Sequence, residues 1–203
     1  MKIIFLDIDG VLAVNHKNCD EYGSLFHEQF KYHLYHIADS VSNLHVVVSS
    51  SWRKSGWIAI KEMWEHRKIH VPLLDITPSI RLQRGMIGFY KDITDQQKEQ
   101  YRGYSIPRGC EIEYWLKEEA NFQRINWSKE EQIKRIEKSK VKNYVILDDD
   151  SDMLLNQKEH YVKCSNQWNE PDAIEGFGLT FTAAMKAIEI LNTDIIDLYY
   201  PQN

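Results

Sequence analysis

The stretch IIFLDIDGVL, residues 3–12, joins an apolar run of strand length to two carboxylates and a glycine. Residues at positions i and i+2 of a strand point to the same side, so Asp7 and Asp9 face one pocket if the extended geometry continues past the strand. Two neighbouring carboxylates repel each other unless a cation or a shared proton lies between them. A hard divalent cation such as Mg²⁺, which takes oxygen ligands, is the simplest occupant. The pair also fits a turn after a buried strand, because Asp-Gly is a common turn sequence.

Hydrophobic runs and helical periodicities alternate along the rest of the chain. Short apolar or β-branched runs predict strands at residues 2–6, 44–48, 71–76, 144–147 and 161–163. Helical patterns predict helices at 28–42, 57–67 and 108–116, and a last helix that starts at 178–180. A charged stretch at 128–140, with a capping box from Ser128 to Glu131, predicts another. This alternation predicts an α/β fold, a doubly wound and mainly parallel sheet flanked by helices.

Three of the predicted strands end in polar clusters. These are the pair Asp7 and Asp9, the serines 49–51, and the acidic run 148–152. Ligands of doubly wound sheets bind at the carboxyl ends of the strands, so the three clusters meet at one edge if the strands are neighbours. Taken singly, the serines could instead cap the following helix, and the acidic run could be a polar turn.

The order of these clusters resembles the motifs of the haloacid dehalogenase (HAD) superfamily of phosphatases and phosphotransferases. The resemblance implies that Asp7 is the nucleophile and Asp9 the general acid and base. It also implies that the serine strand end binds the substrate phosphate, with Ser50 as the first choice and Ser49 as the fallback.

The same resemblance implies a Mg²⁺ site and a basic residue beside it. Asp148 and Asp149 would complete the metal site with Asp7 and the backbone carbonyl of Asp9, and Asp152 is a further candidate. The basic residue ahead of the acidic strand is Arg108, at the start of a predicted helix, where most of the superfamily has lysine. Lys140 and Lys142 are the alternatives.

A closer resemblance is to the HAD domains of nucleic-acid repair proteins that act on RNA. It is carried by the segments Ser50-Ser51-Trp52-Arg53, Thr77-Pro78, Arg108-Gly-Cys-Glu111-Ile112, Leu147-Asp-Asp-Asp and Gly178-Leu179-Thr180. The resemblance implies a substrate with a phosphate on a polynucleotide or nucleotide end. We expect Trp52 to pack and Arg53 to pair with a carboxylate such as Glu111. If Arg53 faces the site instead, it is a second phosphate ligand.

The length of 203 residues fits a single HAD-like domain over residues 1–203. Small insertions are expected at 14–43 and 79–107, which leave room for at most a small cap or flap. A weakly covered site stays open to bulky substrates. Basic and aromatic residues in the second insertion could contact a phosphate backbone and stack on bases, or form a solvated loop.

Composition narrows the partners of the protein. Twenty-five basic and thirty acidic residues give a net charge of −5, which does not suggest a general nucleic-acid binder. The apolar run before Asp7 is too short for a signal peptide, and no apolar run in the sequence is long enough to span a membrane. The three cysteines show no metal-binding spacing. We therefore expect a cytoplasmic protein that binds a phosphorylated substrate and no membrane; the sequence gives no oligomeric state.

The predicted function is a Mg²⁺-dependent phosphomonoester hydrolase that works through an aspartyl-phosphate. Two alternatives use the same scaffold. One is a small-metabolite phosphatase or phosphotransferase with the same residues. The other is a non-catalytic module that binds phosphate or a protein, although such a module has no need of both aspartates, the serine and the acidic run.

Overall fold

A computed structural model describes residues 1–14, 18–79, 106–119, 141–164 and 177–195. Five parallel strands form its sheet in the order β5-β4-β1-β6-β7. Their bounds are β1 Lys2–Leu6, β4 Leu44–Val48, β5 Leu73–Ile76, β6 Asn143–Asp148 and β7 Tyr161–Lys163. The predicted strands are all present, and the doubly wound parallel sheet is confirmed.

β1 lies at the centre of the sheet because two strands pair with it in register. Leu6 at its end lies opposite Val48 of β4 and Leu147 of β6. The chain moves outward from β1 to β4 and β5, and then returns to the other side of β1 with β6. This reversal of strand order is the kind of position at which open α/β sheets bind ligands.

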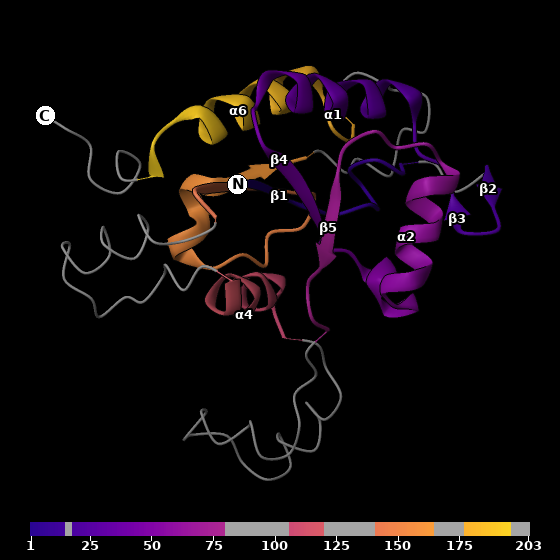
Figure 1. Cartoon of the computed structure of the whole chain (residues 1–203), viewed down its shortest axis with the longest axis horizontal. Coiled ribbons are helices and arrows are strands. Elements are labelled where there is room, and N and C mark those ends of the chain that lie inside the picture. The colour runs from indigo at the N-terminus through magenta and orange to yellow at the C-terminus, as the bar shows by residue number, and fades with distance from the viewer. Residues whose placement is uncertain (15–17, 80–105, 120–140, 165–176, 196–203) are drawn as a thin grey trace, which may run out of the picture.

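Helices cover both faces of the sheet (Figure 1). α1 (Glu28–Ser40) and α6 (Phe181–Asn192) lie side by side on one face, and α4 (Arg108–Glu119) lies on the other. Alternate residues of β1 point to opposite faces of the sheet, as the two-residue period of a strand requires. Ile4 and Leu6 pack in a core with α1, α6 and α2 (Trp57–His66). Ile3 and Phe5 pack with Ile112, Trp115 and Leu116 of α4.

Two short 3₁₀ helices and a small hairpin complete the described structure. η1 (Ser51–Ser55) follows β4, and η3 (Leu155–His160) precedes β7. The hairpin pairs β2 (Cys19–Asp20) with β3 (Gly23–Ser24). Arg67, which follows α2, binds the hairpin through both carboxylate oxygens of Asp20, at 3.0 and 2.7 Å, and through the carbonyl of Ser24.

The segment 14–43, expected to be an insertion, divides into the hairpin region and α1. α1 is part of the sheet-covering layer, because Phe30, Leu34 and Ile37 are buried in the core. Most of the other expected insertion, 79–107, and the predicted helix at 128–140 lie outside the described residues. Within the described ranges, none of the helices has the length and apolar character needed to cross a membrane.

Candidate active site

The carboxyl edge of the sheet brings the polar strand ends together. The sheet hydrogen bonding continues one residue beyond β1 and β4, because the N–H of Asp7 donates to the Leu147 carbonyl at 2.9 Å and the N–H of Ser49 donates to the Leu6 carbonyl at 2.8 Å. Asp7 therefore lies between the end of β4 and the end of β6, where Asp148 is the last residue. The three polar clusters meet at this edge, as predicted.

The turn after β1 is tight and leaves room for a side chain from β6. The N–H of Gly10 donates to the Ala13 carbonyl at 2.9 Å. Gly10 has a φ of 74°, a conformation that favours glycine. A Cβ at this position would lie 2.3 Å from Oδ2 of Asp149. Glycine at position 10 thus allows the Asp149 carboxylate to lie directly against the turn that carries Asp9.

Three carboxylates converge beside this turn. Asp7, Asp148 and Asp149 each offer one oxygen, and these oxygens lie within 4.8 Å of one another. Oδ2 of Asp148 is buried and, among the described residues, accepts no hydrogen bond, although it lies 2.9 Å from Nη1 of Arg108. A buried acceptor without a donor needs an explanation, and a place in the coordination shell of a cation supplies one. An all-oxygen set of this kind fits Mg²⁺.

The electrostatics of the cluster also favour a cation. Burial raises the pKa of Asp7 above its ordinary value, against the opposing effects of Arg108, Ser50 and the backbone N–H of Ile8. Burial, and then the charge of Asp7, raise the pKa of Asp148 to about 8. Ionised carboxylates at this spacing need more positive charge than one arginine supplies, and a divalent cation adds it.

Arg108 is the basic residue that reaches the cluster. Its Nη1 lies 2.6 Å from Oδ2 of Asp7 and donates to the Ser49 carbonyl at 2.5 Å. Burial alone would lower the pKa of Arg108, but Asp7 and Asp148 raise it, so the guanidinium stays charged. Lys142 precedes β6 at the opposite end of the sheet, where its N–H donates to the Met1 carbonyl. Lys140 lies outside the described residues.

Asp152, a further candidate metal ligand in the sequence, lies at the start of α4. Its Oδ2 accepts a 2.8 Å hydrogen bond from the backbone N–H of Arg108, the first residue of α4. It is not part of the three-carboxylate cluster found among the described residues. Asp152 therefore caps the helix that delivers Arg108, and its negative charge at a helix N-terminus is stabilising.

The serines after β4 point in different directions. The side chain of Ser50 lies near enough to Asp7 to lower the pKa of that carboxyl, and its Oγ accepts a hydrogen bond from the N–H of Trp52 at the start of η1. The hydroxyl of Ser49 accepts a 3.2 Å hydrogen bond from Oγ1 of Thr77, at the end of β5. Ser50 is thus the serine that lies near the candidate nucleophile, and it also forms the helix cap that was the alternative interpretation.

Asp9 lies outside the three-carboxylate cluster of the described residues. Its Oδ2 accepts a 2.9 Å hydrogen bond from Nε1 of Trp52 and lies 3.5 Å from Oγ of Ser51. The same indole packs near Phe26, at 6.1 Å between ring centroids, and against Gly23 of the hairpin. The sequence predicted that Trp52 packs, but its hydrogen bond to Asp9 was missed, because no pattern in the sequence shows where an indole N–H points.

Arg53 and Glu111 form the buried ion pair that was predicted. The second guanidinium nitrogen of Arg53, Nη1, donates to the Ser50 carbonyl at 2.6 Å. The pair therefore joins the segment that holds Ser50 to α4, the helix that holds Arg108. Both side chains are more than nine-tenths buried, and breaking such a pair typically costs about 3–5 kcal/mol.

The doubly wound sheet has a central Asp-x-Asp strand end, a serine strand end and an acidic strand end, and this arrangement is consistent with a HAD fold. Residues 3–168 match the family described as the HAD domain in Swiss Army Knife RNA repair proteins. The chain belongs to this family. Searches of curated proteins and of solved structures gave no match.

Proposed function

We propose that this protein is a Mg²⁺-dependent phosphomonoester hydrolase that forms an aspartyl-phosphate on Asp7. The observation that carries the proposal is the position of Asp7, with Arg108 Nη1 2.6 Å from its Oδ2 and the carboxylates of Asp148 and Asp149 beside it. Family membership supports a phosphatase scaffold.

The main obstacle to this chemistry is charge, because a carboxylate must approach a phosphate. At 4 Å and an effective dielectric constant of about 20, one pair of like charges repels by about 4 kcal/mol. Arg108 and the Ser50 hydroxyl would hold phosphoryl oxygens and reduce this repulsion. Asp7, Asp148 and Asp149 would hold the Mg²⁺, which when bound neutralises charge on the phosphoryl group.

The reaction then has two steps. An oxygen of Asp7 attacks phosphorus, the bond from phosphorus to the alcohol oxygen breaks, and Asp9 donates a proton to the departing oxygen. Asp9 next takes a proton from a water molecule, which attacks phosphorus and breaks the bond to Asp7. Inorganic phosphate leaves, and Asp7 and Asp9 return to their initial states. The hydrogen bond from Trp52 supports this role of Asp9, because it fixes the carboxylate that must move the proton.

An assay with an aryl phosphate tests the reaction. Phosphate release should require Mg²⁺ and should be lost in Asp7→Asn. The matched control is Asp39→Asn, the same chemical change at an exposed residue of α1, which should keep the wild-type rate. Equal rates for wild type and Asp7→Asn would reject the mechanism.

We further propose that the substrate phosphate is on a polynucleotide or nucleotide end, as the family's link with RNA repair suggests. A panel of oligonucleotide 3′- and 5′-phosphates, nucleotides and sugar phosphates tests this. Higher kcat/KM for the nucleic-acid substrates is the expected result. A preference for sugar phosphates would instead indicate a small-metabolite phosphatase, and inactivity on the whole panel would indicate a binding module.

A further inference from the structure

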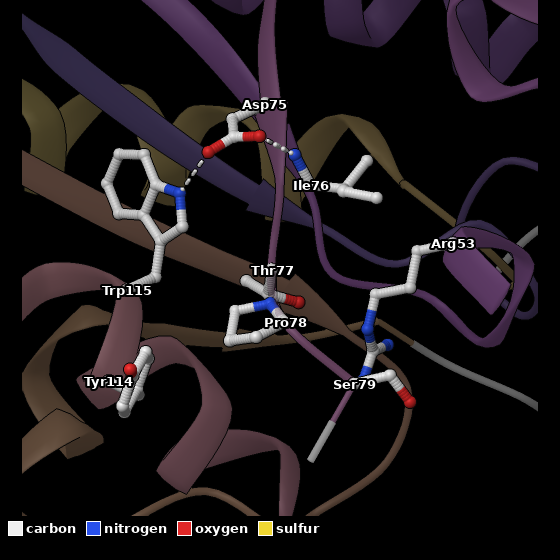
Figure 2. Close-up of a pocket in the computed structure, with 8 residues that line it drawn as sticks. All are labelled: Arg53, Asp75, Ile76, Thr77, Pro78, Ser79, Tyr114 and Trp115. Atoms are coloured by element: carbon white, nitrogen blue, oxygen red, sulfur yellow. Dashed lines mark hydrogen bonds between the residues drawn. The ribbon is translucent and has the colours of Figure 1, made fainter. Parts of the chain in front are cut away.

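A pocket lies beside the candidate active site, between the end of β5 and α4 (Figure 2). Its volume is about 340 Å³, which is within the usual range for small-molecule sites. The residues that give it its chemistry are Arg53, Asp75, Thr77, Pro78, Tyr114 and Trp115.

The walls of the pocket are bonded directly to the serines of the site. Thr77 donates to the hydroxyl of Ser49 at 3.2 Å, and Arg53 donates to the carbonyl of Ser50 at 2.6 Å. α4 contributes Arg108 to the site and Tyr114 and Trp115 to the pocket. The pocket and the site thus share the Ser49–Ser50 segment and α4, which is the position expected of a subsite for the alcohol portion of a substrate.

The charges in the pocket disfavour a second phosphate. The guanidinium of Arg53 is already paired with Glu111. Among the described residues of the lining, the other side chain that carries charge at neutral pH is Asp75, a carboxylate that would repel an anion. The pocket thus suits a group that is neutral and polar.

Its hydrogen-bonding groups and rings suit a planar heterocycle. Asp75 accepts from Nε1 of Trp115 at 2.7 Å and from the N–H of Ile76 at 2.8 Å (Figure 2). A carboxylate has about four acceptor positions, so it can take further N–H donors from a ligand. Tyr114 is half exposed, which leaves its ring available for stacking.

We infer that this pocket binds the nucleobase of the nucleoside that carries the phosphate. The inference rests on the proposed phosphatase function. It adds that the enzyme recognises its leaving alcohol, a nucleoside, by the base. Specificity for the base then comes from stacking on Tyr114 and from hydrogen bonds that N–H groups of the base donate to Asp75. The phosphate is held at Ser50 and Arg108.

The first test compares substrates that differ only in the base. Wild-type kcat/KM should be higher for nucleoside 5′-monophosphates than for ribose 5-phosphate. Tyr114→Ala should lower kcat/KM about tenfold on the nucleotides, as expected for the loss of one base–aromatic stack, and leave ribose 5-phosphate unchanged. Tyr32→Ala, which removes an exposed tyrosine from α1 on the other face, should change neither. An equal effect of Tyr114→Ala on both substrate classes, or no effect on either, would overturn the inference.

A binding measurement separates this inference from the proposed function. Nucleosides without phosphate are added to Asp7→Asn protein, and binding is followed by ligand-observed NMR. We expect saturable binding that is lost in Tyr114→Ala and kept in Tyr32→Ala. If the nucleosides bind in this way but the wild-type protein hydrolyses no phosphate ester, the proposed function fails and the base pocket stands. If phosphate esters are hydrolysed but nucleosides do not bind, or if inorganic phosphate competes for the Tyr114-dependent site, the base pocket fails and the phosphatase stands.

Discussion

Nε1 of Trp52 donates a 2.9 Å hydrogen bond to Oδ2 of Asp9. The indole that makes this bond also lies against Gly23 of the β2–β3 hairpin. The guanidinium carbon of Arg67 lies 5.3 Å from the centroid of the indole ring, and the same guanidinium binds Asp20 of the hairpin. Trp52 therefore contacts both the hairpin and Asp9, the candidate general acid. A shift of the hairpin would move the indole and so change the position of the Asp9 carboxylate.

Replacing Trp52 with phenylalanine should lower kcat on an aryl phosphate by about tenfold or more. The ring still packs near Phe26, but the donor to the Asp9 carboxylate is lost, and a hydrogen bond to a charged group is worth about 1.5–3 kcal/mol. Trp64→Phe is the matched control, because Nε1 of Trp64 donates to the Val71 carbonyl, away from Asp9. Steady-state kinetics check the prediction, and it is wrong if the two variants have the same kcat.

Arg108→Ala should reduce kcat/KM by about 10²–10³-fold, the usual loss when one preorganised donor to a developing charge is removed. Arg108→Lys should recover part of this loss, since lysine keeps the charge but not the planar fork of donors. Lys142→Ala should have the wild-type value, because Lys142 is at the opposite end of the sheet. A large effect of Lys142→Ala with a small effect of Arg108→Ala would mean that the basic residue has been assigned wrongly.

Mg²⁺ should stabilise the folded protein through the three-carboxylate cluster. A ligand at 100 times its Kd adds about 2.7 kcal/mol, which raises Tm by about 5–10 °C in a protein of this size. Asp148→Asn should remove most of this increase, since Asp148 belongs to the cluster. Asp152→Asn should keep it, since Asp152 caps α4. Thermal melts with and without Mg²⁺ check the prediction, which fails if Asp148→Asn keeps the full increase.

His160 should make stability depend on pH away from the active site. It is fully buried, stacks on Tyr144 with ring centroids 3.9 Å apart, and binds the Tyr144 carbonyl through Nδ1. Burial lowers its pKa from 6.5 to about 4. Since the folded-state pKa is below the unfolded one, the contribution of neutral His160 to stability is complete above pH 6.5 and is lost as the pH falls to about 4. The loss is about 3 kcal/mol.

Urea unfolding of wild type and His160→Gln at a series of pH values measures this effect. Glutamine does not titrate, while all the other titratable groups are the same in both proteins. Those groups therefore contribute equally to the pH dependence of the two free energies of unfolding. The stability advantage of the wild type over the variant should decrease by about 3 kcal/mol between pH 7 and pH 4. An advantage that is independent of pH would show that His160 has an ordinary pKa in the folded state.

The sequence was sufficient to predict which strand ends meet. Parallel strands in register place the residues that follow them at one edge, so Asp7, Ser49 and Asp148 could be assigned to the same site from chain order and hydrophobic runs. The Arg53–Glu111 pair was also predicted correctly, because a buried guanidinium needs a carboxylate.

Side-chain direction could not be predicted in the same way. Ser49 and Ser50 are adjacent and chemically identical, yet Ser50 caps η1 and lies near Asp7, while the Ser49 hydroxyl bonds to Thr77. Asp152 follows the acidic strand closely in sequence, yet the approach of α4 makes it a helix cap. Both outcomes depend on contacts between segments far apart in the chain, and local sequence carries little information about them.

Acid-quench trapping with an aryl phosphate labelled in its phosphoryl group tests the role of Asp7 most directly. An aryl alcohol leaves readily without a proton donor, so Asp9→Asn should still form the aspartyl-phosphate but hydrolyse it slowly, and labelled protein should accumulate. The label should be released by hydroxylamine, as an acyl phosphate is, and should be absent from Asp7→Asn. Release of phosphate by the wild type with no labelled protein in either the wild type or Asp9→Asn, or label that persists in Asp7→Asn, would contradict the claim that Asp7 is the nucleophile.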